Sequence, residues 1–238
     1  MSFSYGWRGP NIVKDGLSLY LDAGSPNSYF NKSSIILGDA SGGGNNGTLI
    51  NGPTYDSLNG GSIVFDGVDD YINCGTASTA TIRGSSQFTI SYWFKKFSSG
   101  NDFNLGTLDN SANKGIFIQW FTDSNIYFGV FSGSRSYNYV NLPYTSNWYN
   151  FTFTFDGSLV GSTNISKLYI NSVQQSLTNS GGMPTSVPTD VLNLSLGKIT
   201  NYSSMSKGNI AVMQVYNTAL SSTEILKNYN ALKTRFGL

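Results

Sequence analysis

Apolar and polar side chains alternate along much of this chain, with the period of two residues that is typical of β-strands. Residues 87–96 and 147–156 show the pattern most clearly. Both segments are therefore predicted to be strands with one face in a core and one face turned outward. The apolar positions are Phe88, Ile90, Tyr92 and Phe94 in the first segment, and Tyr149, Phe151, Phe153 and Phe155 in the second.

Shorter stretches predict further strands, separated by turns that are rich in Gly, Asn and Ser. These stretches are residues 17–22, 48–50, 167–173, 192–198 and 209–216. Residues 115–121 and 125–131 form a predicted hairpin, and because both arms are apolar at even and odd positions, we expect both of its faces to be covered. Many short strands with few helices predict an all-β sandwich.

The segment Gly61–Cys74, GSIVFDGVDDYINC, predicts two strands joined by a tight acidic turn, in the manner of a hairpin. Ile63 and Phe65 share one side of the first strand, and Tyr71 is expected to return to the same core. Gly supplies the positive φ angles of such turns, and Asp side chains accept hydrogen bonds from nearby backbone. The turn residues of this kind are Asp66, Gly67, Asp69 and Asp70.

One helix is predicted, over about residues 222–232, because Ser221 and Glu224 fit a capping box. Its apolar positions at helical spacing are Ile225, Leu226, Tyr229 and Leu232. Neither an internal repeat nor a linker divides the chain. We therefore expect one domain, residues 17–238, preceded by an irregular N-terminal arm, residues 1–16.

Composition excludes several classes of function. Charged residues make up 11% of the chain and the formal net charge is +1, so nucleic acid is not an expected partner. The chain has no histidine and one cysteine, Cys74, which excludes a His-based triad, a zinc–thiolate site and an intrachain disulfide. No apolar run approaches the ~18 residues of a membrane helix, so no membrane insertion is expected.

The first residues, MSFSYGWRGPNIVKDG, lack the basic and then apolar segments of a secretory signal. The composition, in which Asn, Ser, Thr and Gly supply most of the polarity, is nevertheless typical of extracellular proteins. A virion protein is assembled in the host cytoplasm and works outside the cell. We therefore expect a virion location.

Six segments resemble, in order and spacing, the laminin-G-like domains of the concanavalin A-like lectin/glucanase class. They are GLSLYLDAGSPNSY, SIVFDGVDDYI, FTISYWFK, WYNFTFTFDG, KLYINSVQQ and GNIAVMQVYNTALSSTEILKNYNAL. The resemblance implies a jelly-roll β-sandwich of two antiparallel sheets with one short C-terminal helix. At residues 37–42 the chain has LGDASG where relatives often have Trp-x-Asp-Leu-Ser-Gly, so a site that depends on that tryptophan is not carried over.

The variant that begins with LYLDAGSPNSY and ends in YNALKTRFGL is most similar to domains in structural proteins of tailed bacteriophages. The resemblance implies a non-enzymatic virion component, either a capsid decoration subunit or a tail or fibre adhesin. Such a protein would be present in many copies or as a homo-oligomer, contact other virion proteins and bind host-surface glycans. The alternative is a free bacterial carbohydrate-binding protein, or a polysaccharide-degrading enzyme of the same fold.

Carboxylate usage speaks against an enzyme. Glycosidases need two carboxyl groups that flank the scissile bond. The jelly-roll glucanases of the class that this chain resembles carry these groups in a Glu-x-Asp-x-(x)-Glu motif on one strand. This chain has a single glutamate, Glu224, which the helix cap already explains. The one dense carboxylate cluster is Asp66 with Asp69 and Asp70. We expect no catalytic residue.

Calcium is the candidate cofactor for the aspartates. The ion takes about six to eight oxygens from carboxylates, carbonyls and water. Five carboxylates converge if the N-terminal strand and the Gly/Asn loop lie beside the acidic turn: Asp22, Asp39, Asp66, Asp69 and Asp70. The alternative is that these side chains only stabilise turns.

Aromatic residues supply the candidate glycan contacts. Trp93 and Trp148 fall on the outward positions of their strands, and two exposed indoles would form a platform for a sugar ring. The alternative is that the indoles are buried beneath loops. Tyrosines in loop-like, polar segments are candidate rim contacts: Tyr137, Tyr139, Tyr144 and Tyr202.

The N-terminal arm carries three aromatic residues, Phe3, Tyr5 and Trp7, among small ones. Such a segment cannot bury these side chains by itself. The arm is expected either to dock on a neighbouring protein or to pack across the edge of its own domain.

Overall fold

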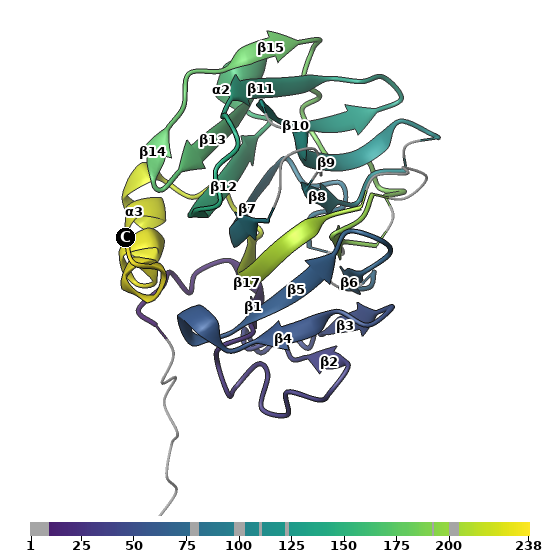
Figure 1. The fold of residues 1–238 in the computed structure, drawn as a ribbon. Coiled ribbons are helices and arrows are strands. Elements are labelled where there is room, and N and C mark those ends of the chain that lie inside the picture. Colours follow the sequence, from purple (N-terminus) through teal and green to yellow (C-terminus); the bar gives the residue numbers. More distant parts are fainter. Residues whose placement is uncertain are drawn as a thin grey trace, which may run out of the picture.

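The computed structural model describes residues 10–76, 81–97, 103–109, 111–121, 124–191, 193–199 and 205–238. Over these residues the chain forms two β-sheets that pack against each other, with a short helix near the C-terminus (Figure 1). Pairings between the described strands are antiparallel. The predicted all-β jelly-roll sandwich is confirmed.

Sheet A has eight strands in the order β14-β13-β12-β7-β17-β5-β4, and β1 also pairs with β17. Its strands are β1 (Leu17–Asp22), β4 (Thr54–Asp56), β5 (Ser62–Asp66), β7 (Gln87–Lys96), β12 (Trp148–Asp156), β13 (Ser166–Ile170), β14 (Val173–Gln174) and β17 (Lys207–Tyr216). The two segments with the clearest alternation, β7 and β12, lie side by side near the centre of this sheet.

Sheet B has nine strands in the order β15-β11-β10-β9-β8-β16-β6-β3-β2. Its strands are β2 (Ile36–Leu37), β3 (Gly47–Ile50), β6 (Tyr71–Asn73), β8 (Phe103–Gly106), β9 (Lys114–Phe121), β10 (Asn125–Ser132), β11 (Tyr137–Asn141), β15 (Thr178–Ser180) and β16 (Ser195–Leu196). The hairpin predicted from residues 115–131 is confirmed as β9 and β10.

The core lies between the two sheets and is rich in aromatic rings. Tyr92 on β7 has its ring centroid 5.1 Å from that of Phe103 on β8 and 5.5 Å from that of Phe151 on β12. The predicted apolar positions of β7 and β12 contribute to one continuous core cluster, together with Ile118 and Phe128 of sheet B. Burial of these alternating side chains explains why both segments form strands.

The acidic turn joins the two sheets rather than two strands of one hairpin. β5 pairs with β4 and β17 in sheet A, whereas β6 pairs with β3 and β16 in sheet B. The predicted hairpin is therefore wrong. Ile72 enters the core, being 0% exposed. Tyr71 points the other way and lies below the Lys198 ammonium, 4.9 Å from it, because neighbouring residues of a strand face opposite sides.

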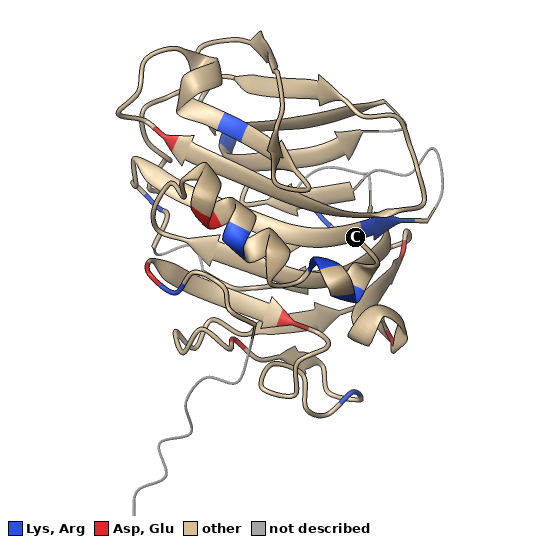
Figure 2. Ribbon diagram, turned by 90° about the vertical axis from the view of Figure 1, so that its left-hand side faces the viewer, with Lys and Arg blue, Asp and Glu red and all other residues tan. Residues whose placement is uncertain are grey.

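The outer face of sheet A is covered by the C-terminal segment. Helix α3 (Ser222–Asn230) is followed by the short 3-10 helix η2 (Lys233–Phe236), and both lie across this sheet (Figures 1 and 2). The predicted capping box of α3 is confirmed, because Ser221 Oγ accepts a hydrogen bond from the Glu224 backbone and Glu224 accepts one from the Ser221 backbone. The cap fixes where this cover begins.

Residues 10–16 also lie against the outer side of sheet A. Ile12 and Val13 are buried, and the Val13 N–H donates to Asn228 Oδ1 at 2.7 Å while the Tyr216 hydroxyl donates to the Val13 carbonyl at 3.2 Å. The last residues of the predicted arm therefore pack on their own domain. The candidate interaction residues Phe3, Tyr5 and Trp7 lie outside the described residues.

The remaining helical elements in the described ranges are short: η1 (Leu58–Gly60) and α2 (Ser162–Ile165). None of the described helices is long and apolar enough to cross a membrane.

Candidate functional site

The outer face of sheet B presents aromatic side chains from three neighbouring strands. Alternation sends Ile118 and Phe128 into the core, and the residues beside them point outward. Register places Tyr127 on β10 directly between Gln119 on β9 and Tyr139 on β11. The outward aromatic residues of these strands are Phe117, Phe121, Tyr127, Phe131, Tyr137 and Tyr139.

Tyr127 lies at the centre of this aromatic group. Its ring centroid is 5.4 Å from those of Tyr137 and Tyr139 and 6.1 Å from that of Phe121. The Tyr127 and Tyr137 rings meet edge to face, with an interplanar angle of 81°. Edge-to-face pairs are a favoured aromatic geometry, so the rings hold one another in place.

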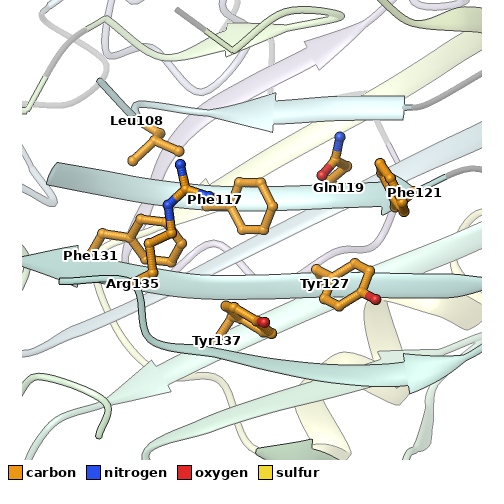
Figure 3. Close-up of a pocket in the computed structure, with 8 residues that line it drawn as sticks. All are labelled: Leu108, Phe117, Gln119, Phe121, Tyr127, Phe131, Arg135 and Tyr137. Atoms are coloured by element: carbon orange, nitrogen blue, oxygen red, sulfur yellow. The ribbon is translucent and has the colours of Figure 1, made fainter. Parts of the chain in front are cut away.

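These rings border a groove with a volume of about 210 Å³. In Figure 3 its side chains stand on one side of β9, β10 and the start of β11, with Arg135 at one end and Phe121 at the other. The lining is mostly apolar, with one amide and one cation. The lining residues are Leu108, Phe117, Gln119, Phe121, Tyr127, Phe131, Arg135 and Tyr137.

Polar groups stand at the Phe121 end of the groove. Asn125 Nδ2 donates to the Tyr127 hydroxyl at 3.2 Å, and Asn141 Nδ2 donates to the Ser124 carbonyl at 2.8 Å. These amides flank the apolar floor without covering it, since Phe121 remains 39% exposed. An apolar floor with amides and hydroxyls at its rim suits a ligand that has both C–H faces and hydroxyl groups.

Comparison with known proteins identifies the family. Residues 66–226 match the laminin G-like family described as the Concanavalin A-like lectin/glucanases superfamily. The chain belongs to this family. No curated protein matches the chain in sequence.

Solved structures of the same fold include binding domains of botulinum neurotoxins. The receptor binding domain of the C/D mosaic serotype has a TM-score of 0.63 and 17% identity, over 92% of this chain and 52% of that chain. The serotype D ligand binding domain in complex with N-acetylneuraminic acid has a TM-score of 0.62 and 17% identity, over 92% of this chain and 51% of that one. This family member thus spans about half the length of these toxin domains.

Another similar structure matches over nearly its whole length. It is domain 4 of an extracellular arabinanase from Geobacillus stearothermophilus, in complex with arabinotriose. The TM-score is 0.64 at 17% identity, over 90% of this chain and 98% of that chain. Similarity at this level of identity establishes a shared fold only. The ligand of this chain has to be inferred from the residues of its own site.

The predicted tryptophan platform of this laminin G-like domain is wrong. Trp93 and Trp148 do share the outer face of sheet A, but they are only 1% and 7% exposed. Phe236 of η2 covers both, with ring centroids 4.1 Å from Trp93 and 4.8 Å from Trp148, and Trp148 Nε1 donates to Asn59 Oδ1 at 3.0 Å. The C-terminal segment therefore occupies the place where a sugar would have to stack.

The predicted rim tyrosines divide into three groups. Tyr137 and Tyr139 lie on strand β11 rather than in a loop, and both belong to the aromatic group beside the groove. Tyr144 lies elsewhere, with its ring centroid 5.5 Å from the Lys96 ammonium. Tyr202 lies outside the described residues.

Three of the five predicted metal ligands come together. One carboxylate oxygen from each of Asp66, Asp69 and Asp70 lies within 4.8 Å of the others. Burial and the charge of Asp66 and Asp69 raise the pKa of Asp70 above its ordinary value, although the Asp66 N–H donates to Asp70 Oδ2 at 3.0 Å. Val68 N–H donates to Asp66 Oδ1 at 2.8 Å, so the predicted turn bonding is confirmed.

Asp22 and Asp39 do not join this cluster, so the predicted five-carboxylate site is wrong. Asp22 is 3% exposed and pairs with Arg235, whose Nη1 lies 2.7 Å from Asp22 Oδ1. Asp39 accepts hydrogen bonds from the backbone of Tyr20, Ser41 and Asn45, at 2.9, 2.9 and 3.0 Å. Both carboxylates hold the chain in place, because each is already bound to donors from elsewhere in the fold.

Two other reactive groups are used structurally. Hydrogen bonds from Ser221 lower the pKa of Glu224, which forms the capping box of α3 together with Ser221. Burial raises the pKa of the Cys74 thiol to about 12. A buried thiol with a raised pKa supplies little thiolate at neutral pH.

Sequence reasoning missed most of the groove. The prediction that both faces of the β9–β10 hairpin are covered holds at Phe131, which is 3% exposed, and fails at Phe121, which is 39% exposed. The signal was present, because the outward positions of β9 and β10 carry four aromatic residues where a solvent-exposed strand face would be mostly polar. The pattern records that a face is apolar and not whether another segment lies over it.

Proposed function

We propose that the protein is a carbohydrate-binding module and that the groove on the outer face of sheet B is its binding site. One observation carries the proposal. The outer face of sheet A is closed by the chain's own C-terminal segment, whereas on the described part of sheet B the rings of Phe121, Tyr127 and Tyr137 stay partly exposed beside amides and hydroxyls. Exposed apolar patches of this kind commonly mark binding sites.

The chemistry of a sugar ring matches this surface. One face of a pyranose or furanose ring presents C–H groups that can lie on the rings of Tyr127 or Phe121, and its edge presents hydroxyls. The Tyr127 hydroxyl and the amides of Asn125 and Asn141 stand at hydrogen-bonding positions around those rings. Aromatic contact supplies affinity, and the few polar groups fix orientation.

The similar structures support this reading at the level of the fold. The arabinanase domain holds arabinotriose, and a toxin domain holds N-acetylneuraminic acid. Because this chain matches about half of the toxin domains and nearly all of the arabinanase domain, the latter is the closer parallel in extent. Both ligands are saccharides, which agrees with the aromatic groove.

We propose that the module binds without cleaving. Glycoside hydrolysis needs a pair of carboxyl groups beside the bond, and the described lining of the groove contains no Asp or Glu. The one glutamate of the chain caps α3. A test is to incubate the pure protein with polysaccharides and measure reducing ends, where turnover would contradict the proposal.

The finer proposal is a virion component, such as a capsid decoration subunit or a tail or fibre adhesin, that presents the groove to host-surface glycans. It rests on the similarity of the sequence to domains in bacteriophage structural proteins. We expect the protein to copurify with virus particles in many copies, as measured by quantitative mass spectrometry of gradient-purified particles. Recovery in the particle-free fraction alone would favour the free bacterial protein.

Binding is tested first on an array of oligosaccharides that includes arabinotriose and sialyllactose, and then by calorimetry with the tightest binder. We expect Tyr127→Ala and Tyr137→Ala each to weaken binding about tenfold or more, which is the effect of an interface hot spot. Both residues are partly exposed, so the variants should stay folded.

Phe30→Ala is the matched control, because Phe30 is an exposed aromatic residue, 86% exposed, outside the groove. This variant should bind like the unaltered protein. The proposal fails if no saccharide binds, or if the two groove variants bind as tightly as the control.

A further inference from the structure

The groove carries one charged side chain among its eight described lining residues, and it is a cation, Arg135. We propose that the groove selects saccharides that bear a carboxylate, such as uronic or sialic acids, and that the Arg135 guanidinium binds this group. The inference rests on the proposed function and names the class of sugar that the same site takes.

The fold fixes where Arg135 stands. It lies in the turn between β10 and β11, and its Nε donates to Asn113 Oδ1 at 3.0 Å. The Gly133 N–H of the same turn donates to the Asn113 carbonyl at 2.9 Å. Two hydrogen bonds to one residue therefore tie this turn to the segment that leads into β9. They hold the turn that carries Arg135 beside the groove.

The guanidinium group lies at the edge of the aromatic floor, beside Leu108 and Phe117 (Figure 3). A guanidinium presents its donors in a planar fork that matches the two oxygens of a carboxylate. A sugar that stacks along the floor toward Tyr127 would bring a carboxylate on its ring or side chain to this end.

Two described carboxylates close to this end in sequence or through Lys114 are engaged with other groups. Asp109 Oδ1 accepts hydrogen bonds from the backbone N–H and the hydroxyl of Ser111, at 3.0 and 2.6 Å. Asp190 pairs with Lys114, with 2.5 Å between Oδ2 and Nζ. The described lining of the groove itself holds no acid, and Arg135 is its one charged side chain.

The decisive experiment uses saccharides that differ only in the carboxylate. Oligogalacturonate is compared with its methyl ester, and 3′-sialyllactose with the methyl ester of its sialic acid carboxylate, by calorimetry on the full chain. In at least one pair we expect the acid to bind about tenfold or more tightly than its neutral partner, with a preference that shrinks as NaCl is added. Equal affinity for acid and neutral forms in both pairs would overturn the inference.

Substitutions then assign the preference to Arg135. Arg135→Gln should lower the acid-to-neutral ratio to near one, and Arg135→Lys should keep part of it, because lysine retains the charge but not the fork. Lys227→Gln is the control for net charge, since Lys227 is exposed on α3, on the opposite face of the sandwich. An unchanged ratio in Arg135→Gln would show that the carboxylate is bound elsewhere.

These outcomes are separable from failure of the proposed function. If the neutral partners bind in the groove as tightly as the acids, and Tyr127→Ala weakens both, the carbohydrate site stands and the inference about acids falls. If none of the four saccharides nor any other on the array binds, both fall together.

Discussion

Both sheets turn a row of aromatic side chains away from the core, and among the described residues the row on sheet A is buried while the row on sheet B is exposed at one end. On sheet A, Trp93 stacks on Phe236 and is 1% exposed. On sheet B, Phe121 stands beside Tyr127 and is 39% exposed. The difference lies in the C-terminal segment, which crosses sheet A and not the groove of sheet B (Figures 1 and 2).

The comparison separates two uses of the same residue type. Under the cover, aromatic rings fill volume, and the polar atom of an indole finds a partner within the domain, as Trp148 does with Asn59. In the open groove, the hydroxyl of Tyr127 meets an amide at the surface, where a ligand can reach it. A row of outward aromatics therefore indicates a binding face only when the segments that could cover it lie elsewhere.

The largest effect on stability is expected in the C-terminal segment that covers sheet A. Phe236→Ala removes a buried ring that contacts both Trp93 and Trp148, so the free energy of unfolding should fall by about 3–5 kcal/mol. The matched variant on the open face, Phe121→Ala, should cost less than about 1 kcal/mol, because its ring is already partly in water. Urea denaturation followed by tryptophan fluorescence measures both.

The same pair of variants tests whether the two faces differ in cover and in ligand binding. Similar losses of stability in both would mean that the two faces do not differ as described. Saccharide binding, measured where Phe236→Ala is still folded, should be retained in that variant and weakened in Phe121→Ala. The opposite order would place the binding site on sheet A.

A smaller effect is expected at the acidic turn that joins the two sheets. The pKa of Asp70 is raised by burial and by Asp66 and Asp69, so the folded protein holds this proton more tightly than the unfolded chain does. The carboxyl thus contributes stability at low pH, and this contribution is lost as the pH rises through the raised pKa. Asp70→Asn should therefore raise the melting temperature at pH 7, and the gain should vanish toward pH 3.

Adding Ca²⁺ to the same melting experiment tests whether the acidic turn binds the ion. If the three carboxylates hold the ion, adding Ca²⁺ should raise the melting temperature of the unaltered protein and not that of Asp70→Asn. If they only shape the turn, Ca²⁺ should leave both melting temperatures where they are. A lower melting temperature for Asp70→Asn at pH 7 would contradict the assigned direction of the pKa shift.

Local patterns predicted most of the fold correctly. The alternation in β7 and β12 identified their buried faces, and the spacing of Ser221 and Glu224 identified the start of α3. These features depend on residues a few positions apart, so the sequence alone contains them. The hairpin of β9 and β10 was found for the same reason.

Long-range contacts account for what was missed. Nothing near Trp93 in the sequence indicates that Phe236 lies over it, and nothing near Asp22 indicates its pairing with Arg235. The turn after β5 has the residues of a hairpin, yet its two arms enter different sheets. Such arrangements are decided by which faces must be buried together in the whole fold.

The covered face also receives both ends of the described chain. Ile12 and Phe236 belong to the same buried cluster against sheet A, while the groove opens on the far side of the sandwich. A larger particle joined to the domain through either of these ends would hold it by its closed side. The groove would then open into the surrounding medium, so attachment and ligand binding could operate at once without competing for space.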